Sequence, residues 1–257
     1  MGKVIAFSNH KGGVGKTTST VNVGAGLCTL GKKILLVDMD PQANLSQSLG
    51  VMDAQKSIYG ALRGHYDVGE SLLNLKDGLD LIPSELDLSG AEVELSIEAG
   101  REFILSEMLN PYRSQYDFIL IDCPPSLGLL TVNSLTAADE VYLPLQAEFL
   151  ALQGLSKLVE VINKIKGRLN RHLIIGGVFV TQFDQRKVLN RNVLETIQKH
   201  FNDKVFTTRI RDNVALAEAP TSGKDIFEYN PKSYGAEDYA RLCTEILQRT
   251  NREASAH

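Results

Sequence analysis

Residues 11–18 of this chain read Lys-Gly-Gly-Val-Gly-Lys-Thr-Thr, and this stretch decides the fold. It follows a short apolar run, Val4–Ser8, that predicts a buried strand, and it leads into Thr17–Leu30, which predicts a helix ending at Gly31. Glycines let backbone N–H groups crowd around an anion, and the amino terminus of a helix adds partial positive charge. A strand, a glycine-rich turn and a helix in this order therefore predict a phosphate-binding loop.

The loop departs from the simplest pattern, GxxxxGK[ST], because His10 stands where the first glycine is expected. The chemistry of the pattern remains, since Lys16 can reach the β- and γ-phosphates and the Thr17 hydroxyl can ligate Mg²⁺. The alternative is a glycine-rich turn without a ligand, which the two lysines and two threonines disfavour. The residues expected to hold nucleotide phosphates are Lys11, Gly12, Gly13, Val14, Gly15, Lys16, Thr17 and Thr18.

Further apolar runs predict more strands, and their continuous rather than alternating pattern is typical of strands buried on both faces of a parallel sheet. These runs are Lys33–Asp38, Leu79–Pro83, Phe118–Asp122, Glu140–Leu145, Leu173–Val180 and Val205–Ile210. Helices are predicted at Leu88–Leu109, Leu150–Leu169, Val188–Phe201 and Tyr234–Arg249. The alternation predicts a doubly wound α/β fold with a mostly parallel sheet, as one domain over residues 1–250 with a polar tail at 251–257.

Carboxylates follow two of the predicted strands. Asp38 and Asp40 end one, and Asp122 ends another, at the edge where a parallel sheet binds its ligands. Asp122 is expected to hold Mg²⁺ through a water, because Mg²⁺ keeps several of its waters. The alternatives are a helix cap for Asp38 and Asp40, and a solvent-facing carboxylate for Asp122. Cys123 is interpreted as a small buried residue rather than a nucleophile.

The composition excludes several classes of protein. The chain has 257 residues, 43% hydrophobic and 23% charged, which excludes a disordered or fibrous protein. Its 3 cysteines form no CxxC pair, which argues against a zinc ribbon or disulfide framework and favours a reduced, cytoplasmic protein. No apolar run approaches the roughly 18 residues of a membrane helix. Glycines interrupt the amino terminus too early for a signal peptide.

The net charge of −4 conceals an asymmetry. An acidic total argues at first sight against a nucleic-acid partner. However, residues 1–150 carry 10 Lys and Arg against 19 Asp and Glu, whereas residues 151–257 carry 17 against 12. The carboxy-terminal part can therefore present a basic face, with an ordinary solvated surface as the simpler alternative.

The stretch KGGVGKTT resembles the deviant Walker A box of the ParA/MinD group of P-loop ATPases, whose distinguishing mark is the added lysine, Lys11 here. Three further stretches, Asp87–Leu95, Asn213–Lys224 and Tyr229–Glu237, closely resemble the chromosomal ParA (Soj) type. The resemblance covers nearly the whole chain. It implies ATP or ADP and Mg²⁺ as cofactors, and a homodimer with two ATP molecules sandwiched between its subunits.

The resemblance also implies individual roles. Lys11 would cross the dimer interface to the partner's phosphates and would act with Lys16 and Asp40 in catalysis. Asp40 lies in a segment that resembles switch I and would position or activate the attacking water. The residues expected at the metal are Thr17, Asp40 and Asp122. The residues expected to border the adenine are Gln182, Asp184, Arg211 and Asn213.

For the carboxy-terminal half, the resemblance implies DNA binding without sequence preference, mainly by phosphate neutralisation. The candidate residues are Arg186, Lys187, Arg191, Arg209, Arg211, Lys224, Lys232 and Arg241. A solvated surface charge is the alternative for each of them. The chain departs from the family at Ala215, where an arginine implicated in DNA binding often stands, so the DNA surface is expected to be weaker or differently placed.

The predicted function is that of a cytoplasmic, nucleoid-associated partition ATPase, slow until a ParB-like partner stimulates it. A positioning ATPase for a non-DNA cargo and a MinD-like membrane-cycling ATPase are the alternatives. The final residues, ILQRTNREASAH, have little apolar area to insert into a membrane, which disfavours the second. No paired cysteines suit the cluster of a nitrogenase iron protein. Because the chain begins at its first strand, no operator-binding module is expected.

Overall fold

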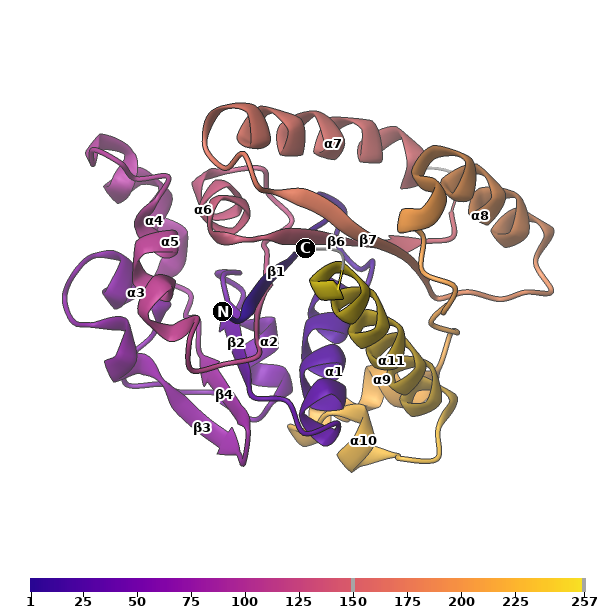
Figure 1. Cartoon of the computed structure of the whole chain (residues 1–257). Coiled ribbons are helices and arrows are strands. Elements are labelled where there is room, and N and C mark those ends of the chain that lie inside the picture. Colours follow the sequence, from indigo (N-terminus) through magenta and orange to yellow (C-terminus); the bar gives the residue numbers. More distant parts are fainter. Residues whose placement is uncertain (149–150, 256–257) are drawn as a thin grey trace.

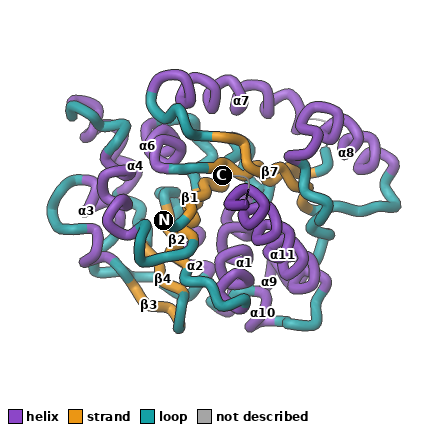
Figure 2. The backbone as a smooth tube through the Cα atoms, viewed as in Figure 1, coloured by secondary structure: helices purple, strands orange, loops and turns teal. Residues whose placement is uncertain are grey.

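The apolar runs of the sequence form the centre of the molecule, a 7-stranded sheet in the order β3-β4-β2-β5-β1-β6-β7 (Figures 1 and 2). The computed structural model describes residues 1–148 and 151–255. Its strands are β1 (Lys3–Phe7), β2 (Ile34–Asp38), β3 (Leu73–Lys76), β4 (Leu79–Ile82), β5 (Phe118–Asp122), β6 (Glu140–Gln146) and β7 (Ile174–Thr181). All neighbours pair in parallel except β3 and β4, which confirms the predicted mostly parallel sheet.

Helices cover both faces of the sheet (Figure 1). They are α1 (Lys16–Thr29), α2 (Asn44–Ser48), α3 (Ile58–Leu62), α4 (Leu88–Glu94), α5 (Ile104–Leu109), α6 (Leu129–Ala137), α7 (Ala151–Arg168), α8 (Val188–Phe201), α9 (Val214–Glu218), α10 (Ile226–Tyr229) and α11 (Tyr234–Ser255). The doubly wound α/β architecture is therefore confirmed.

Alternate residues of the inner strands enter two separate hydrophobic clusters. Val4 and Ala6 of β1 pack on one face with side chains of α3 to α8. Ile5 and Phe7 pack on the other face with α1, α9, α10 and α11. Because the side chains of the inner strands meet a helix layer on either face of the sheet, these strands are almost entirely apolar, which is the pattern that the sequence displays.

The register brings the carboxyl ends of the central strands together. Asp122 of β5 lies beside Phe7 of β1 on one side and beside Asp38 of β2 on the other. The phosphate-binding loop continues from Phe7 into α1. The sheet therefore places both carboxylates next to the loop, as parallel strands require.

The stretch Val205–Ile210, for which the apolar pattern predicts a strand, forms no strand in the structure. It meets β7 through one isolated bridge, Val178 with Val205, and through the Ile210 amide, which donates to the Val180 carbonyl. The amides of Thr207 and Thr208 donate instead to the Glu245 carboxylate of α11, at 2.8 and 3.0 Å. A side chain from another element thus replaces the ladder.

The predicted long helix over Leu88–Leu109 is also interrupted. It is divided into α4, a 3₁₀ turn at Leu95–Ile97 and α5. Gly100 has a φ of +73°, a left-handed conformation that an α-helix does not contain. The amphipathic spacing correctly predicts which side chains are buried, among them Leu88, Ala91 and Leu105, but it does not indicate where the helix is interrupted.

Further differences lie at element ends and in one missed strand. The antiparallel strand β3 has no apolar run of its own, because it lies at the sheet edge and is only half buried. Helix α11 continues past Arg249 to Ser255, through part of the predicted tail, whose last residues 256–257 lie outside the described chain. Leu150, where the helix predicted at Leu150–Leu169 begins, also lies outside it.

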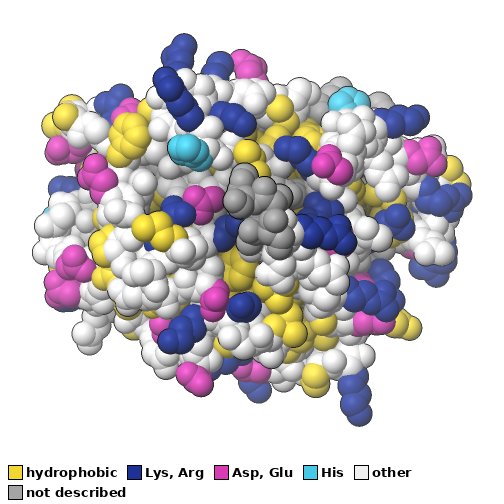
Figure 3. Space-filling view, in the orientation of Figure 1, with side chains coloured by type: hydrophobic (Ala, Val, Ile, Leu, Met, Phe, Trp, Pro, Cys, Tyr) yellow, Lys and Arg dark blue, Asp and Glu magenta, His cyan; other side chains and the backbone are white. Residues whose placement is uncertain are grey.

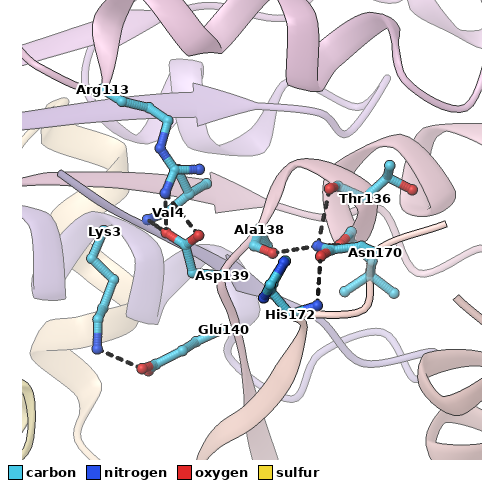
Figure 4. A network of polar contacts seen from close by, with 10 residues as sticks. Lys3, Val4, Arg113, Thr136, Ala138, Asp139, Glu140, Asn170 and His172 are labelled. Carbon is cyan, nitrogen blue, oxygen red and sulfur yellow. Dashed lines mark hydrogen bonds and ion pairs between the residues drawn. The ribbon is translucent and has the colours of Figure 1, made fainter. Parts of the chain in front are cut away.

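A polar network holds the amino-terminal ends of β1 and β6, at the end of the sheet away from the phosphate loop (Figure 4). The Asp139 carboxylate accepts the Val4 amide at 2.8 Å and a forked contact from Arg113 at 2.6 and 2.7 Å. The Asn170 amide nitrogen donates to the Ala138 carbonyl at 2.7 Å and to two carbonyls at the end of α6. These contacts tie β1, β6 and α6 together away from the phosphate loop.

No helix within residues 1–148 and 151–255 has the length and apolar character to cross a membrane.

Candidate nucleotide-binding site

The phosphate loop is an open cradle of backbone. Gly13 and Gly15 have φ values of +74° and +84°, which only glycine adopts freely. Among the described residues, no atom lies within 4 Å of the place that a Cβ would occupy on Gly12 or Gly13. Helix α1 begins directly after Gly15, and the first amides of a helix have no partner inside it. The loop therefore offers unshielded N–H groups and a helix terminus to an anion.

Thr17 and Asp122 meet beside this loop. The Thr17 hydroxyl donates to Asp122 Oδ2 at 2.6 Å, and the Thr20 hydroxyl lies 3.4 Å from Oδ1. Asp122 is fully buried. Burial and the neighbouring Asp38 carboxylate raise the pKa of Asp122, while the Thr17 hydrogen bond lowers it. A cation at this position would relieve the buried charge.

The donor set fits Mg²⁺ of a bound nucleotide. The described residues contain no group of three or more His, Cys, Asp or Glu side chains that could hold a metal by themselves. One carboxylate, one hydroxyl and the oxygens of a phosphate are the kind of ligands with which Mg²⁺ combines its waters. The pair of Thr17 and Asp122 therefore suits a metal that arrives with phosphate.

Lys16 lies within the loop and is 7% exposed. Its ammonium donates to the Lys11 carbonyl at 3.2 Å. Burial lowers the pKa of Lys16, and the carboxylates of Asp122 and Asp40 oppose that shift. The structure thus brings this lysine together with both carboxylates predicted at the metal.

Asp38 and Asp40 differ in their partners. Asp38 is fully buried and accepts the amide and the hydroxyl of Ser46 at 2.9 and 2.7 Å. Burial raises its pKa to about 6, against these hydrogen bonds. Asp40 is 7% exposed, and its carboxylate accepts only the Gln42 amide, at 3.0 Å, among the contacts of the described residues. Asp38 therefore shapes the loop, whereas Asp40 retains acceptor capacity.

Lys11 is held by its own chain. Its ammonium lies 3.3 Å from Oε1 of Gln146, the last residue of β6, and 2.7 Å from Oε2 of Glu148, two residues further on. Gln146 in turn donates to Gln182 at 2.6 Å, and Gln182 donates to the Gly13 carbonyl at 2.9 Å. Gln182 has a φ of +50°, a rare conformation for this residue type. This chain of contacts holds the phosphate loop to the ends of β6 and β7.

A cavity of about 150 Å³ adjoins the loop on the side of Gly15 and Thr18. Three of the four residues expected at the adenine line it: Gln182, Arg211 and Asn213. Asp184 does not line it. The Asp184 carboxylate instead pairs with Arg186 at 2.9 Å, and the Arg186 hydrogen bonds lower its pKa to about 2. Asn213 also caps α9 by accepting the Ala215 amide at 3.0 Å.

The candidate DNA-binding residues are spread over several elements. Lys and Arg side chains are concentrated on the side of the molecule where Figure 1 places α8 and α11 (Figure 3). Arg191 donates to the Gln185 carbonyl, Arg209 stacks over Phe183, and Arg241 pairs with Glu237. Within the described residues, Lys187, Lys224 and Lys232 are exposed and enter no ion pair.

Some residues at the site were not predicted from the sequence. Gln146 and Glu148 follow a predicted strand, so the rule that located Asp122 could have found them. Tyr239 lines the cavity and exchanges a hydrogen bond with Ser19 at 2.9 Å. It lies in the second turn of α11, and nothing in its local sequence indicates a role at the loop.

Comparisons with known proteins agree with this geometry. A family model described as an AAA domain matches residues 2–175. The sporulation initiation inhibitor protein Soj of Bacillus subtilis (strain 168) is 47% identical over 249 residues, which cover 96% of this chain and 98% of the relative. The chromosome partitioning protein ParA of Caulobacter vibrioides (strain NA1000 / CB15N) is 43% identical over 260 residues, with 99% and 97% covered.

Solved structures show the same fold. A cobyrinic acid a,c-diamide synthase from Mycobacterium smegmatis, with bound ADP and magnesium, has a TM-score of 0.87 at 34% identity, covering 98% of this chain and 96% of that one. The cell division ATPase MinD of Pyrococcus furiosus has a TM-score of 0.81 at 28% identity, covering 96% and 99%.

Proposed function

We propose, from the premise that this chain belongs to the Soj/ParA family of chromosome-partitioning ATPases, that it binds Mg-ATP, dimerises around it and then binds DNA without sequence preference. A ParB-like partner would stimulate hydrolysis and thereby release the dimer from the nucleoid. Relatives that are partition proteins match this chain over nearly their whole length, which supports its assignment as a partition-type ATPase.

One observation carries the ATPase assignment. The Thr17 hydroxyl and the buried Asp122 carboxylate lie 2.6 Å apart, beside an open phosphate loop that contains Lys16. This arrangement supports phosphate binding by the loop amides, with Lys16 and Mg²⁺ neutralising charge on the β- and γ-phosphates. The ADP and magnesium in the Mycobacterium smegmatis structure support the same ligands here. We further propose that the 150 Å³ cavity receives the base.

The reaction that follows is hydrolysis of the terminal phosphate. Oxygen of a water forms a bond to the γ-phosphorus while the bond to the β–γ bridging oxygen breaks, so that ADP leaves with that oxygen. Asp40 has acceptor capacity to spare and would orient the water by accepting a hydrogen bond from it, and the protons of the water would end on the released inorganic phosphate or in solvent. Bound Mg²⁺ would supply charge neutralisation between the β- and γ-phosphates.

We propose that Lys11 completes the site of the partner subunit. It lies at the outer end of the phosphate loop, with its side chain 35% exposed, so it can extend from the surface. A site that lacks this second lysine until two chains meet would hydrolyse ATP slowly in the monomer. Because ATP would favour the dimer and ADP would not, nucleotide and assembly would be linked.

The DNA proposal rests on charge. Phosphate neutralisation needs lysines and arginines near one another, and these gather on the α8 and α11 side of the molecule (Figure 3). In the monomer the excess over residues 151–257 is 17 basic against 12 acidic residues. A dimer would place two such surfaces on one particle, which gives a physical reason for DNA affinity to depend on ATP.

DNA binding with ATP and with ADP across a salt series tests this function. We expect co-sedimentation with unrelated DNA sequences in ATP, a steep loss with salt, and little binding in ADP. Equal binding in both nucleotides would contradict the proposed switch. ATP-dependent dimers that do not bind DNA but pellet with liposomes would favour the membrane-cycling alternative. Capture of an adaptor unlike ParB would favour a positioning ATPase for a non-DNA cargo.

A further inference from the structure

Arg211 lines the cavity beside the phosphate loop, and residues of α11 hold it in place. The Asp238 carboxylate accepts the Arg211 main-chain amide at 2.9 Å. It also accepts Arg211 Nε, at 2.9 and 3.1 Å, and one terminal nitrogen, at 2.6 Å. One carboxylate therefore fixes the backbone and the side chain of the same arginine, which leaves the guanidinium little freedom.

The two acidic neighbours of Arg211 differ in burial. The Asp238 side chain is 3% exposed, whereas that of Glu237, which reaches the same guanidinium at 2.6 Å, is 44% exposed. The Arg211 side chain itself is 36% exposed, so the burial in this pair is that of the Asp238 carboxylate. An ion pair between two exposed groups contributes little, whereas a buried carboxylate without its cation is an uncompensated charge. Asp238 is therefore the partner that decides where Arg211 lies.

An aromatic ring also contacts the Arg211 guanidinium. The guanidinium carbon of Arg211 lies 4.2 Å from the centre of the Tyr234 ring, the first residue of α11. Stacking on an aromatic face fixes the plane of a guanidinium, while the fork of hydrogen bonds fixes its direction within that plane. Three residues of one helical segment, Tyr234, Glu237 and Asp238, thus surround one arginine at the cavity wall.

The residue after Asp238 ties the same helix to the phosphate loop. Tyr239 is 1% exposed, and its hydroxyl lies 2.9 Å from the Ser19 hydroxyl in the first turns of α1. The Ser19 amide donates to the Gly15 carbonyl at 2.9 Å. Adjacent residues of α11 therefore contact both Arg211 and the first turns of the helix that follows the phosphate loop.

We propose that Asp238 is a positioning residue for nucleotide binding, which fixes Arg211 against the base of the nucleotide. The proposal rests on the proposed function in taking the ligand to be ATP or ADP. A planar guanidinium that is held in place can stack on a base or donate to it without a further loss of side-chain freedom on binding. The phosphates bind elsewhere, so Asp238 is expected to affect the base end alone.

The test separates the two ends of the nucleotide. ATP and inorganic tripolyphosphate, each with Mg²⁺, are titrated into the full chain by calorimetry. For Asp238→Asn we expect the Kd for ATP to rise about tenfold, the scale of one hydrogen bond to a charged group. The Kd for tripolyphosphate should stay within about twofold, because this ligand reaches only the loop. The matched control, Glu237→Gln, loses the exposed partner and should change neither value.

A second pair of variants serves if Asp238→Asn folds poorly. Arg211→Ala and Arg211→Ala/Asp238→Ala remove the arginine without and with its buried partner. If Asp238 acts through Arg211, both lose the same affinity for ATP and keep that for tripolyphosphate. Unchanged ATP affinity in Asp238→Asn would overturn the proposal, as would an equal loss for both ligands. A wild-type chain that binds neither ligand would instead refute the proposed function.

Discussion

Lys11 Nζ lies 2.7 Å from Glu148 Oε2, so the lysine expected to reach a second subunit is paired inside its own chain. Both side chains are partly exposed, at 35% and 49%, so the pair contributes at most about 1 kcal/mol and can exchange for a phosphate. In the proposed dimer, Lys11 would therefore exchange an acid of its own chain for the phosphates of the partner's nucleotide.

Lys11→Ala is expected to abolish the ATP-dependent dimer, because the loop then lacks the ammonium that would neutralise phosphate across the interface. Light scattering after size exclusion measures the mass with ATP and with ADP. The control, Glu148→Gln, removes only the competing acid. Its ATP dimer should form at a protein concentration equal to or lower than that of wild type. An undiminished ATP dimer in Lys11→Ala would defeat the crossing role.

Asp40→Ala is expected to keep ATP-dependent dimers while turnover falls by roughly 10²- to 10⁴-fold, the range of a lost acid–base group. Asp40→Asn is the closer variant, since its amide oxygen can still accept the Gln42 amide that Asp40 accepts at 3.0 Å. Phosphate release and dimer mass are measured on both proteins. Normal turnover in either variant would refute the role of Asp40 toward the water.

Thr17→Ala is expected to weaken Mg-ATP binding by about tenfold or more, because the hydroxyl that Asp122 now orients is a proposed ligand of the metal. Thr17→Ser keeps a hydroxyl and should restore most of the affinity. Removal of Mg²⁺ with EDTA should bring wild type and Thr17→Ala to the same weak binding. A difference that persists in EDTA would mean that Thr17 acts on the loop and not through the metal.

Lys187→Ala and Lys232→Ala are each expected to lower the slope of log affinity against log salt by about one unit, the loss of one phosphate contact. Both lysines are exposed. Lys164→Ala serves as the control, since Lys164 is exposed on α7 and paired with Glu160 at 2.7 Å. DNA binding with ATP is followed by fluorescence anisotropy. Slopes equal to that of Lys164→Ala would mean that Lys187 and Lys232 do not contact DNA phosphates.

Glu245→Gln is expected to destabilise the fold by about 2 kcal/mol near neutral pH, through its hydrogen bonds with the Thr207 and Thr208 amides. Burial alone would raise the pKa of Glu245, but these hydrogen bonds lower it below the ordinary value of 4.5. A lowered pKa in the folded chain means stability that is present above pH 4.5 and lost as the pH falls through the folded value.

Urea unfolding of wild type and Glu245→Gln at several pH values measures this difference. The gap between them should be constant from pH 7 to about 5 and shrink below the ordinary pKa of a carboxyl. Glu195→Gln, an exposed carboxylate on α8, is the control and should show no gap. A gap that is independent of pH would point to packing rather than to the charge.

Much of the fold follows from local sequence. The strand at Phe118–Asp122 and the helix at Val188–Phe201 have the predicted bounds, because each has an unbroken pattern of its own and a clear end. The nearness of Asp122 to the phosphate loop also follows, since parallel strands bring their carboxyl ends to one edge. Where the pattern failed, as at Val205–Ile210, the partner that replaced the sheet was Glu245.

The class of fold, the phosphate loop and the strand ends that carry acids can be predicted from the sequence, because these depend on neighbours within a few residues. Three contacts became visible only in the folded chain: Lys11 pairs with Glu148, Asp184 pairs with Arg186 away from the cavity, and Asp238 holds Arg211. Lys11 and Glu148 stand 137 positions apart. No local pattern encodes such a pair, because which distant side chains meet depends on how the helices pack against the sheet.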